Sequence, residues 1–139
     1  MKDKYHIDRF YEVHRNHFDI ALKEIQSGRK TSHWMWYIFP QLKFLGHSYK
    51  AVYYGLENEE EAKVFYEDEY LGDNFRKICR ALLECESDDA LEVMGYPDNL
   101  KLWSSMTLFY IATGDELFKR ILDKFFSGEP DALSVSFLR

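Results

Sequence analysis

Apolar residues recur at helical spacing along most of the chain, and glycines mark where each period stops. From Asp8 to Ser27 the apolar residues return every three to five positions, and Gly28 follows as a C-terminal cap. This pattern predicts a first helix over 8–27.

The rest of the chain continues in the same way. Asn58 with Glu61 fits a capping box that opens a helix. Gly72 is expected to separate this helix from the next one, and Ser87 is expected to cap a later one. The expected helices cover 58–67, 73–85, 87–95, 98–113 and 116–126, with a short helical turn from Pro130. No alternating strand pattern occurs, so the sequence predicts an all-α fold.

The segment from Thr31 to Gly46 is apolar and aromatic but has no clean period. Thr31 or Ser32 can cap a short helix, and Pro40 would end or kink it. The same residues also suit a buried strand by propensity. We expect a short helix followed by irregular chain.

The stretch 98–113 carries apolar residues on every side of the helical wheel. A helix that is apolar all round is buried all round, so this one is expected at the centre of the fold. Ser104, Ser105 and Thr107 interrupt it, and a buried hydroxyl without a partner costs about 1–3 kcal/mol. These hydroxyls therefore either form local hydrogen bonds or line a polar pocket.

Asp98, Lys101 and Ser105 lie three and four positions apart, so their side chains stack along one side of this helix. An acid, an ammonium group and a hydroxyl placed in this way can orient a polar ligand. In the structural alternative, Asp98 is a first-turn acid favoured by the helix dipole, and the serines bond to the preceding turn. Lys101 at a buried helix start needs a counter-charge or water in either case.

Length and composition point to one domain, over 1–139, because 139 residues are too few for two independent cores. The apolar share of 46% and the aromatic share of 17% exclude a disordered chain and favour a core of large side chains. The net charge of −6 argues against binding of duplex nucleic acid, although Arg29 and Lys30 form a local basic pair.

Several kinds of site are disfavoured. Cys79 and Cys85 are six positions apart in a helical stretch and point to different sides of it, so no mutual disulfide is expected. His14 and His17 lack a carboxylate at metal-binding spacing, which favours a solvated face, and no zinc spacing occurs elsewhere. We therefore expect no metal and no cofactor. The chain has neither a hydrophobic leader nor a membrane-spanning run, which predicts a cytoplasmic location without a membrane partner.

The aromatic segment contains candidate catalytic and ligand-binding residues. Histidine suits proton transfer near neutral pH, so His33 is the first catalytic candidate and Asp98 the second. A core histidine that donates to a carbonyl is the structural alternative for His33. Trp34 and Trp36 can stack on a base or a sugar, or belong to the core. Gln41 can bind an amide or hydroxyl edge, or cap its loop.

Two long segments carry a family resemblance: GRKTSHWMWYIFPQL at 28–42 and YPDNLKLWSSMTLF at 96–109. With EAKVFYEDEYLG at 61–72 and ILDKFFSGEPD at 121–131, they make nearly the whole chain similar to the DUF1810 family, a group of small bacterial proteins. Trp103 stands where this family commonly has an arginine. Any contribution of that arginine to ligand binding is therefore missing here.

The resemblance implies an all-α fold and supplies no established activity. Some members carry a calpastatin label, but this compact, aromatic sequence does not resemble that disordered inhibitor. The chain is also similar to the NADAR group, small domains linked to ADP-ribose and nucleotide-sugar processing, in its size, helical make-up and tryptophan-rich segment. This second likeness implies a nucleotide or ADP-ribose-like ligand.

These sequence observations lead to one site prediction and two functional hypotheses. The residues expected to converge on one concave, partly polar pocket are His33, Trp34, Trp36, Gln41, Asp98, Lys101 and Ser105. As an enzyme, the domain would process a nucleotide or ADP-ribose-like molecule, with Lys101 facing a phosphate. As a binding module, it would hold a small ligand or peptide without turnover, and its acidic surface would face a protein partner.

Overall fold

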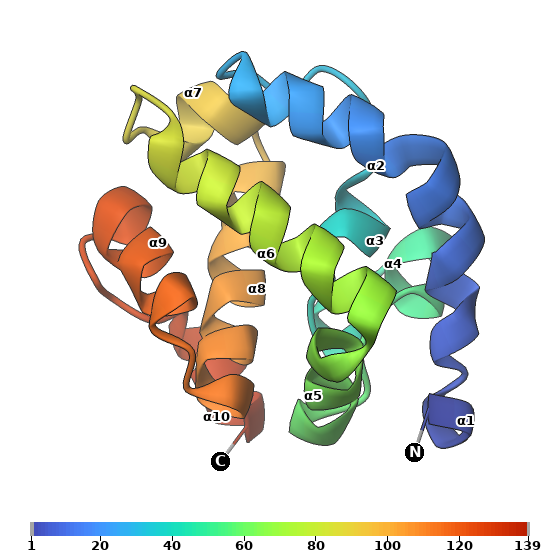
Figure 1. Ribbon diagram of the computed structural model, residues 1–139. Coiled ribbons are helices and arrows are strands. Elements are labelled where there is room, and N and C mark those ends of the chain that lie inside the picture. Colours follow the sequence, from blue (N-terminus) through green and yellow to red (C-terminus); the bar gives the residue numbers. More distant parts are fainter. Residues whose placement is uncertain (1, 139) are drawn as a thin grey trace.

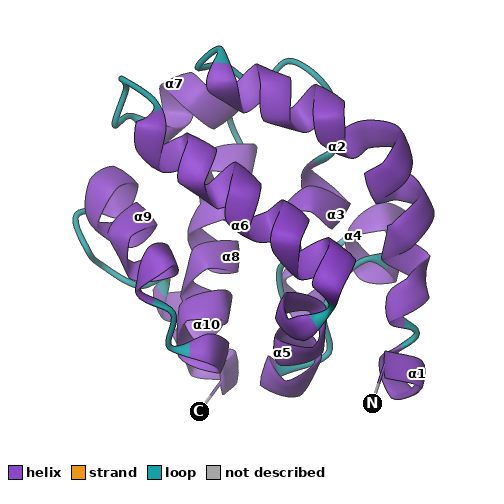
Figure 2. Cartoon of the chain, viewed as in Figure 1, coloured by secondary structure: helices purple, strands orange, loops and turns teal. Residues whose placement is uncertain are grey.

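Helices form nearly all of the regular structure in the computed structural model, which describes residues 2–138 (Figures 1 and 2). In chain order they are α1 (Lys2–Tyr5), the 3-10 turn η1 (Ile7–Phe10), α2 (Tyr11–Gln26), α3 (Met35–Ile38), the 3-10 turn η2 (Lys43–Leu45), α4 (Tyr49–Tyr53), α5 (Glu59–Glu67), α6 (Glu69–Glu84), α7 (Ala90–Met94), α8 (Asp98–Thr113), α9 (Glu116–Phe126) and α10 (Ala132–Leu138). No strand occurs within 2–138, where the β contact is an isolated parallel bridge between Leu42 and Leu56. The predicted all-α fold and the short helix in the aromatic segment are confirmed, and the strand alternative is wrong.

The helices are arranged around α8. This helix packs against α5, α7, α9 and α10, while α6 packs against α2, α5 and α9. In Figure 1, α2 passes across the top of the molecule and down one side, and α6 crosses in front of α8. The core therefore lies between α8 and α6.

One phenylalanine from each of five elements joins this core. The five are Phe10, Phe65, Phe75, Phe109 and Phe118, and each is 0% exposed. Neighbouring ring centroids in this series lie 4.4–5.7 Å apart in edge-on or tilted contacts. Such contacts between aromatic rings stabilise the fold by more than the burial of their apolar surface alone. The core is thus continuous from η1 to α9.

The break between α5 and α6 does not fall at Gly72, as the sequence predicts, but at Asp68. The side chain of Asp68 accepts a hydrogen bond from the Leu71 N–H at 3.0 Å and caps α6. Gly72 lies inside α6, where an added Cβ would stand 2.1 Å from the carbonyl oxygen of Tyr66. The glycine therefore allows close approach of two helices, and it does not separate them.

The expected cap at Ser87 is also displaced. Asp89 caps α7, because its Oδ1 accepts from the Leu91 N–H at 3.0 Å and the Glu92 N–H at 3.4 Å. The Ser87 hydroxyl accepts from the N–H of Asp89 at 3.1 Å and orders the preceding turn. Both residue types make good caps, and only Asp89 directly precedes the first helical residue.

The middle of α8 is buried and its ends are not. Leu102, Met106 and Phe109 are 0% exposed, whereas Leu100 is 44% and Ile111 40% exposed. The expected burial on all sides is therefore confirmed for the middle turns and wrong for the ends.

Two hydroxyls of α8 attach the C-terminal segment. Ser104 Oγ donates to Asp131 Oδ2 at 2.8 Å, and Thr107 Oγ1 accepts from the Asp131 N–H at 2.9 Å. Ser134 Oγ donates to the same carboxylate oxygen at 2.6 Å. Both hydroxyls also donate to the preceding turn, Ser104 Oγ to the Leu100 carbonyl at 3.2 Å and Thr107 Oγ1 to the Trp103 carbonyl at 2.8 Å, which confirms the local hydrogen bonds of the structural alternative. Ser105 is fully buried, and its Oγ has no hydrogen-bond partner among the described residues.

His14 lies in the core, so the solvated face predicted for it is wrong. Its Nε2 is 2.8 Å from the carbonyl oxygen of Tyr37, and its Nδ1 is 3.1 Å from Nδ2 of Asn74. A carbonyl only accepts, so Nε2 carries the proton and Nδ1 accepts from the amide. Burial lowers the pKa of His14 to about 4. One neutral imidazole therefore connects α2 to α3 and α6.

Three further findings concern thiols, metals and membranes. Cys79 and Cys85 are free thiols, as their spacing predicts. The part of the chain that the structure describes has no cluster of side chains suited to a metal ion. In that same part, every helix is too short or too polar to cross a bilayer.

Candidate functional site

A concavity of about 350 Å³ lies between the turn before α3 and the start of α8. Its lining residues are Lys30, Thr31, Ser32, His33, Met35, Trp36, Tyr96, Pro97, Asp98 and Lys101. The turn and the helix start come from the two sequence segments that carry most of the candidate chemistry. They meet because the backbone N–H of Lys30 donates to the carbonyl of Val93, on α7, at 2.7 Å.

The turn over 31–34 is fixed by a single carboxylate on α2. Glu24 accepts hydrogen bonds from the N–H groups of Thr31 and Ser32 at 2.8 and 2.9 Å. It also accepts from the hydroxyl of Ser32 at 2.5 Å and from the indole N–H of Trp34 at 2.9 Å. Burial alone would raise the pKa of Glu24, but these four donors outweigh it and lower the pKa to about 2. The wall of the cavity is therefore anchored to α2.

Replacing Glu24 with alanine should loosen this turn. Hydrogen bonds to a charged group contribute about 1.5–3 kcal/mol, so the Thr31 and Ser32 amides should exchange with solvent at least about tenfold faster. Amide exchange measured by NMR at pH 7 would test this, with Gln26→Ala on the same helix as the control. Unchanged exchange in Glu24→Ala would show that the turn is fixed by other contacts.

Two ammonium groups meet at the cavity on either side of one carboxylate. Lys30 Nζ lies 2.8 Å from Asp98 Oδ2, and Lys101 Nζ lies 3.7 Å from Asp98 Oδ1. The Lys30 side chain is 6% exposed and the Lys101 side chain 27% exposed, so Lys30 forms the floor and Lys101 the open side. This arrangement gives Lys101 the counter-charge that its sequence position requires.

Two lysines from different helices lie close to the ring of Trp36. Lys101 Nζ, from α8, lies 5.7 Å from the centre of the Trp36 ring. Lys50 Nζ, from α4, lies 4.8 Å from the same ring. Cations at these distances are attracted by the negative faces of an indole. Trp36 is half-buried, so part of it faces the cavity.

Four of the seven predicted site residues line the cavity: His33, Trp36, Asp98 and Lys101. His33 is exposed, so its structural alternative as a core histidine is wrong. The structure brings these four together from two segments more than sixty positions apart in the chain.

The other three predicted residues, Trp34, Gln41 and Ser105, do not line this cavity. Trp34 is 1% exposed and Ser105 is 0% exposed, so neither side chain can touch a ligand. Trp34 supports the turn from beneath, because the Lys30 ammonium lies 4.8 Å from its ring. The backbone carbonyl of Gln41 accepts from the Leu56 N–H at 2.9 Å, which places this residue beside the bridge between Leu42 and Leu56.

Sequence reasoning missed Lys30 and the exposed aromatic Tyr96 at this cavity, and it missed Lys50 beside the Trp36 ring. Lys30 and Tyr96 belong to the two motif-dense segments, so proximity to His33 and Asp98 could have suggested them. Tyr96 is 76% exposed and contributes an aromatic ring at the cavity. Nothing in the local sequence marks Lys50, because its relation to Trp36 arises from the packing of α4.

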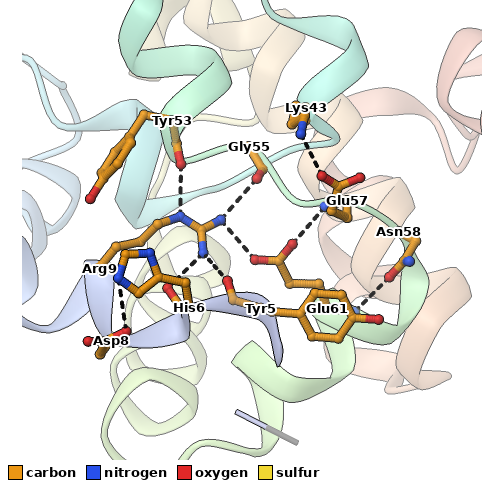
Figure 3. Close-up of polar contacts among 10 residues, drawn as sticks. All are labelled: Tyr5, His6, Asp8, Arg9, Lys43, Tyr53, Gly55, Glu57, Asn58 and Glu61. Carbon is orange, nitrogen blue, oxygen red and sulfur yellow. Dashed lines mark hydrogen bonds and ion pairs between the residues drawn. The ribbon is translucent and has the colours of Figure 1, made fainter. Parts of the chain in front are cut away.

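A second cavity, of about 270 Å³, lies beside Arg9 and Glu61 (Figure 3). Each N–H of the Arg9 guanidinium is used; the acceptors are the carbonyl oxygens of Tyr5, His6, Tyr53 and Gly55 and the carboxylate of Glu61. No donor of Arg9 remains for a ligand. We therefore assign this cluster a structural role and place the candidate site at the Trp36 cavity.

Comparison with known proteins identifies a family and a solved structure. A family model described as "Protein of unknown function (DUF1810)" matches residues 4–138. The conserved hypothetical protein Rv1873 from Mycobacterium tuberculosis is 35% identical, and its crystal structure superimposes with a TM-score of 0.94 over 97% of each chain. No curated protein matches the chain.

Proposed function

This chain belongs to the DUF1810 family, and we propose that it binds a small, anionic, nucleotide-like molecule in the Trp36 cavity. In this proposal the planar part of the ligand stacks on Trp36 or Tyr96, and its phosphate faces Lys101. Aromatic side chains provide a stacking surface for any base, and ammonium groups attract phosphate.

The observation that carries this proposal is the local charge. The protein has a formal net charge of −6, yet two lysines and one carboxylate meet at this cavity, and a third lysine, Lys50, lies against the ring of Trp36. Like charges brought together repel one another, and an anionic ligand would relieve that repulsion. The exposed face of an aromatic residue beside such a cluster suits a ligand that is both planar and anionic.

The geometry favours binding over catalysis. Both carboxylate oxygens of Asp98 face ammonium groups, so Asp98 serves to hold the lysines. His33 lines the cavity, but no hydrogen bond orients its ring among the interactions of residues 2–138. A general base is normally held by a third group, and His33 has none. His33 remains the candidate for proton transfer if turnover occurs.

A thermal-shift screen against AMP, ADP, NAD, ADP-ribose and sugar phosphates tests the proposal. A ligand that binds the native state stabilises it by about 2.7 kcal/mol at a hundredfold excess over Kd. We expect a nucleotide to raise Tm, and Trp36→Ala and Lys101→Ala each to reduce the shift by more than half. Lys77→Ala, an exposed lysine on α6, is the matched control and should respond like the wild type.

Two outcomes would contradict this function. If no phosphate-containing compound raises Tm, the cavity does not bind such ligands. If a compound raises Tm equally in Trp36→Ala and Lys101→Ala, it binds elsewhere. Product found by chromatography after incubation with the bound compound, and lost in His33→Ala, would change the assignment from a binding module to an enzyme.

A further inference from the structure

We propose that a groove between η2, the start of α5 and the end of α10 is a docking site for a basic amphipathic peptide segment of a partner protein. The groove has a volume of about 270 Å³. Its lining residues are Leu42, Phe44, Glu57, Asn58, Glu59, Glu60, Phe137 and Leu138. The groove and the Trp36 cavity share no lining residue, so this site is independent of the proposed function.

Four apolar side chains line this groove, and two of them are aromatic rings open to solvent. Phe44, in η2, is 56% exposed, and Phe137, in α10, is 51% exposed. Their rings stack with centroids 6.0 Å apart at an interplanar angle of 20°. Leu133, four positions before Phe137 on the same side of α10, is also exposed. Exposed apolar residues that adjoin one another, unlike those that occur singly, mark an interaction surface.

The charged residues that line the groove are all acidic. Glu57 precedes α5, and Glu59 and Glu60 lie in its first turn. Lys43 pairs with Glu57, and Lys4 pairs with Glu60, but both lysines line the second cavity and not the groove. Glu59 forms no ion pair within residues 2–138. An occupant of the groove therefore meets carboxylates beside apolar rings.

A basic peptide segment complements both features of the groove. Its lysine or arginine side chains bind carboxylates through charge-assisted hydrogen bonds, and a large apolar side chain between them packs on the phenylalanines. The volume of the groove is below the range of about 300–1,000 Å³ that is usual for small-molecule pockets, and it suits an anchoring side chain. A membrane surface is anionic, so the three glutamates would repel it. A second copy docked across a two-fold axis would bring the same glutamates face to face, which is also unfavourable.

Fluorescence anisotropy with three labelled peptides tests this docking site. The probe is a Leu-Leu-Lys-Lys repeat of about 16 residues, a length at which an isolated helix can form. A Leu-Leu-Glu-Glu repeat keeps the apolar residues and reverses the charge, and a Ser-Ser-Lys-Lys repeat keeps the charge and removes the apolar residues. We expect the wild type to bind the Leu-Leu-Lys-Lys repeat, and to bind each comparison peptide at least about tenfold more weakly.

Variants of the groove should weaken binding of the probe. Phe137→Ala should do so at least about tenfold, as loss of an aromatic anchor does, and Phe44→Ala should do the same without a change in α10. Glu59→Lys should weaken binding at least about fivefold, because it places a like charge beside the peptide. The matched controls lie on α7, at the other end of the molecule (Figure 1). Leu91→Ala removes an exposed apolar side chain and Glu92→Lys makes the same change in net charge, and both should bind like the wild type.

Other results would overturn the proposal. Failure of the Leu-Leu-Lys-Lys repeat to bind, or equal binding of the Leu-Leu-Glu-Glu repeat, would exclude a basic occupant. Affinity that is unchanged in Phe137→Ala and Phe44→Ala, or lowered equally by Glu59→Lys and Glu92→Lys, would place the peptide outside the groove. A dimer in sedimentation velocity, or binding to phosphatidylserine vesicles, that Phe137→Ala abolishes would assign the groove to a second copy or to a membrane. Any nucleotide that raises Tm should do so equally in Phe137→Ala, so this proposal and the proposed function fail separately.

Discussion

Replacing Arg9 with methionine should lower the free energy of unfolding by about 3–5 kcal/mol, the usual cost of breaking a buried ion pair from one side. The side chains of Arg9 and Glu61 are 6% and 2% exposed, and Arg9 Nη2 lies 2.8 Å from Glu61 Oε2. Removal of the guanidinium leaves the Glu61 carboxylate buried with one donor, the N–H of Glu57 at 2.7 Å. It also removes the guanidinium as a donor to four backbone carbonyls (Figure 3).

Chemical denaturation at pH 7 would measure this loss, and two further variants would identify its cause. Arg9→Lys should also be strongly destabilised, because three donors on a flexible stem cannot replace the five of a planar fork. Arg9→Met combined with Glu61→Met should recover part of the loss, because no unpaired charge is then buried. Lys119→Met, which removes an exposed ion pair with Asp123 on α9, is the control and should leave the midpoint unchanged. A small loss in Arg9→Met would show that water replaces the guanidinium.

The wild type should lose about 3 kcal/mol of unfolding free energy between pH 6.5 and pH 4 through His14 alone. Burial lowers the pKa of His14 to about 4 in the folded state, from 6.5 in an unfolded chain. Between these values the unfolded state binds a proton that the folded state does not, so unfolding becomes more favourable as pH falls. The contribution of His14 is complete above pH 6.5 and is lost as pH falls through the folded pKa.

His14→Gln should flatten this part of the pH profile. A glutamine amide can donate to the Tyr37 carbonyl and accept from Asn74, and it does not titrate. Denaturation curves at pH 7 and pH 5 would compare the two proteins; we expect a smaller difference in the variant. The carboxylates whose pKa is lowered, Glu24 to about 2 among them, lose their contribution at lower pH, so they do not affect this comparison. An equal pH dependence in both proteins would assign the effect to other groups.

The sequence alone was sufficient for the existence of the long helices α2, α5, α6, α8 and α9 and for the central position of α8. Apolar periods and caps such as Asn58 are local, because a helix closes its hydrogen bonds within four residues. The two motif-dense segments also indicated a common site, and four of its predicted residues line one cavity. The prediction failed at Gly72, which the sequence pattern indicates as the break between two helices. The reason for this glycine is the close approach of the Tyr66 carbonyl, and only the folded structure shows that contact.

The tertiary structure alone decided the partner of each buried polar group. Glu61 was expected to complete a capping box with Asn58, yet its carboxylate binds Arg9, more than fifty positions away. His14 was expected in solvent, yet packing turns it toward Tyr37 and Asn74. A periodic pattern fixes which face of a helix is apolar, but the element that this face meets depends on the whole chain. Lys50 reaches Trp36 for the same reason, since the distance between their helices is set by packing that no local sequence encodes.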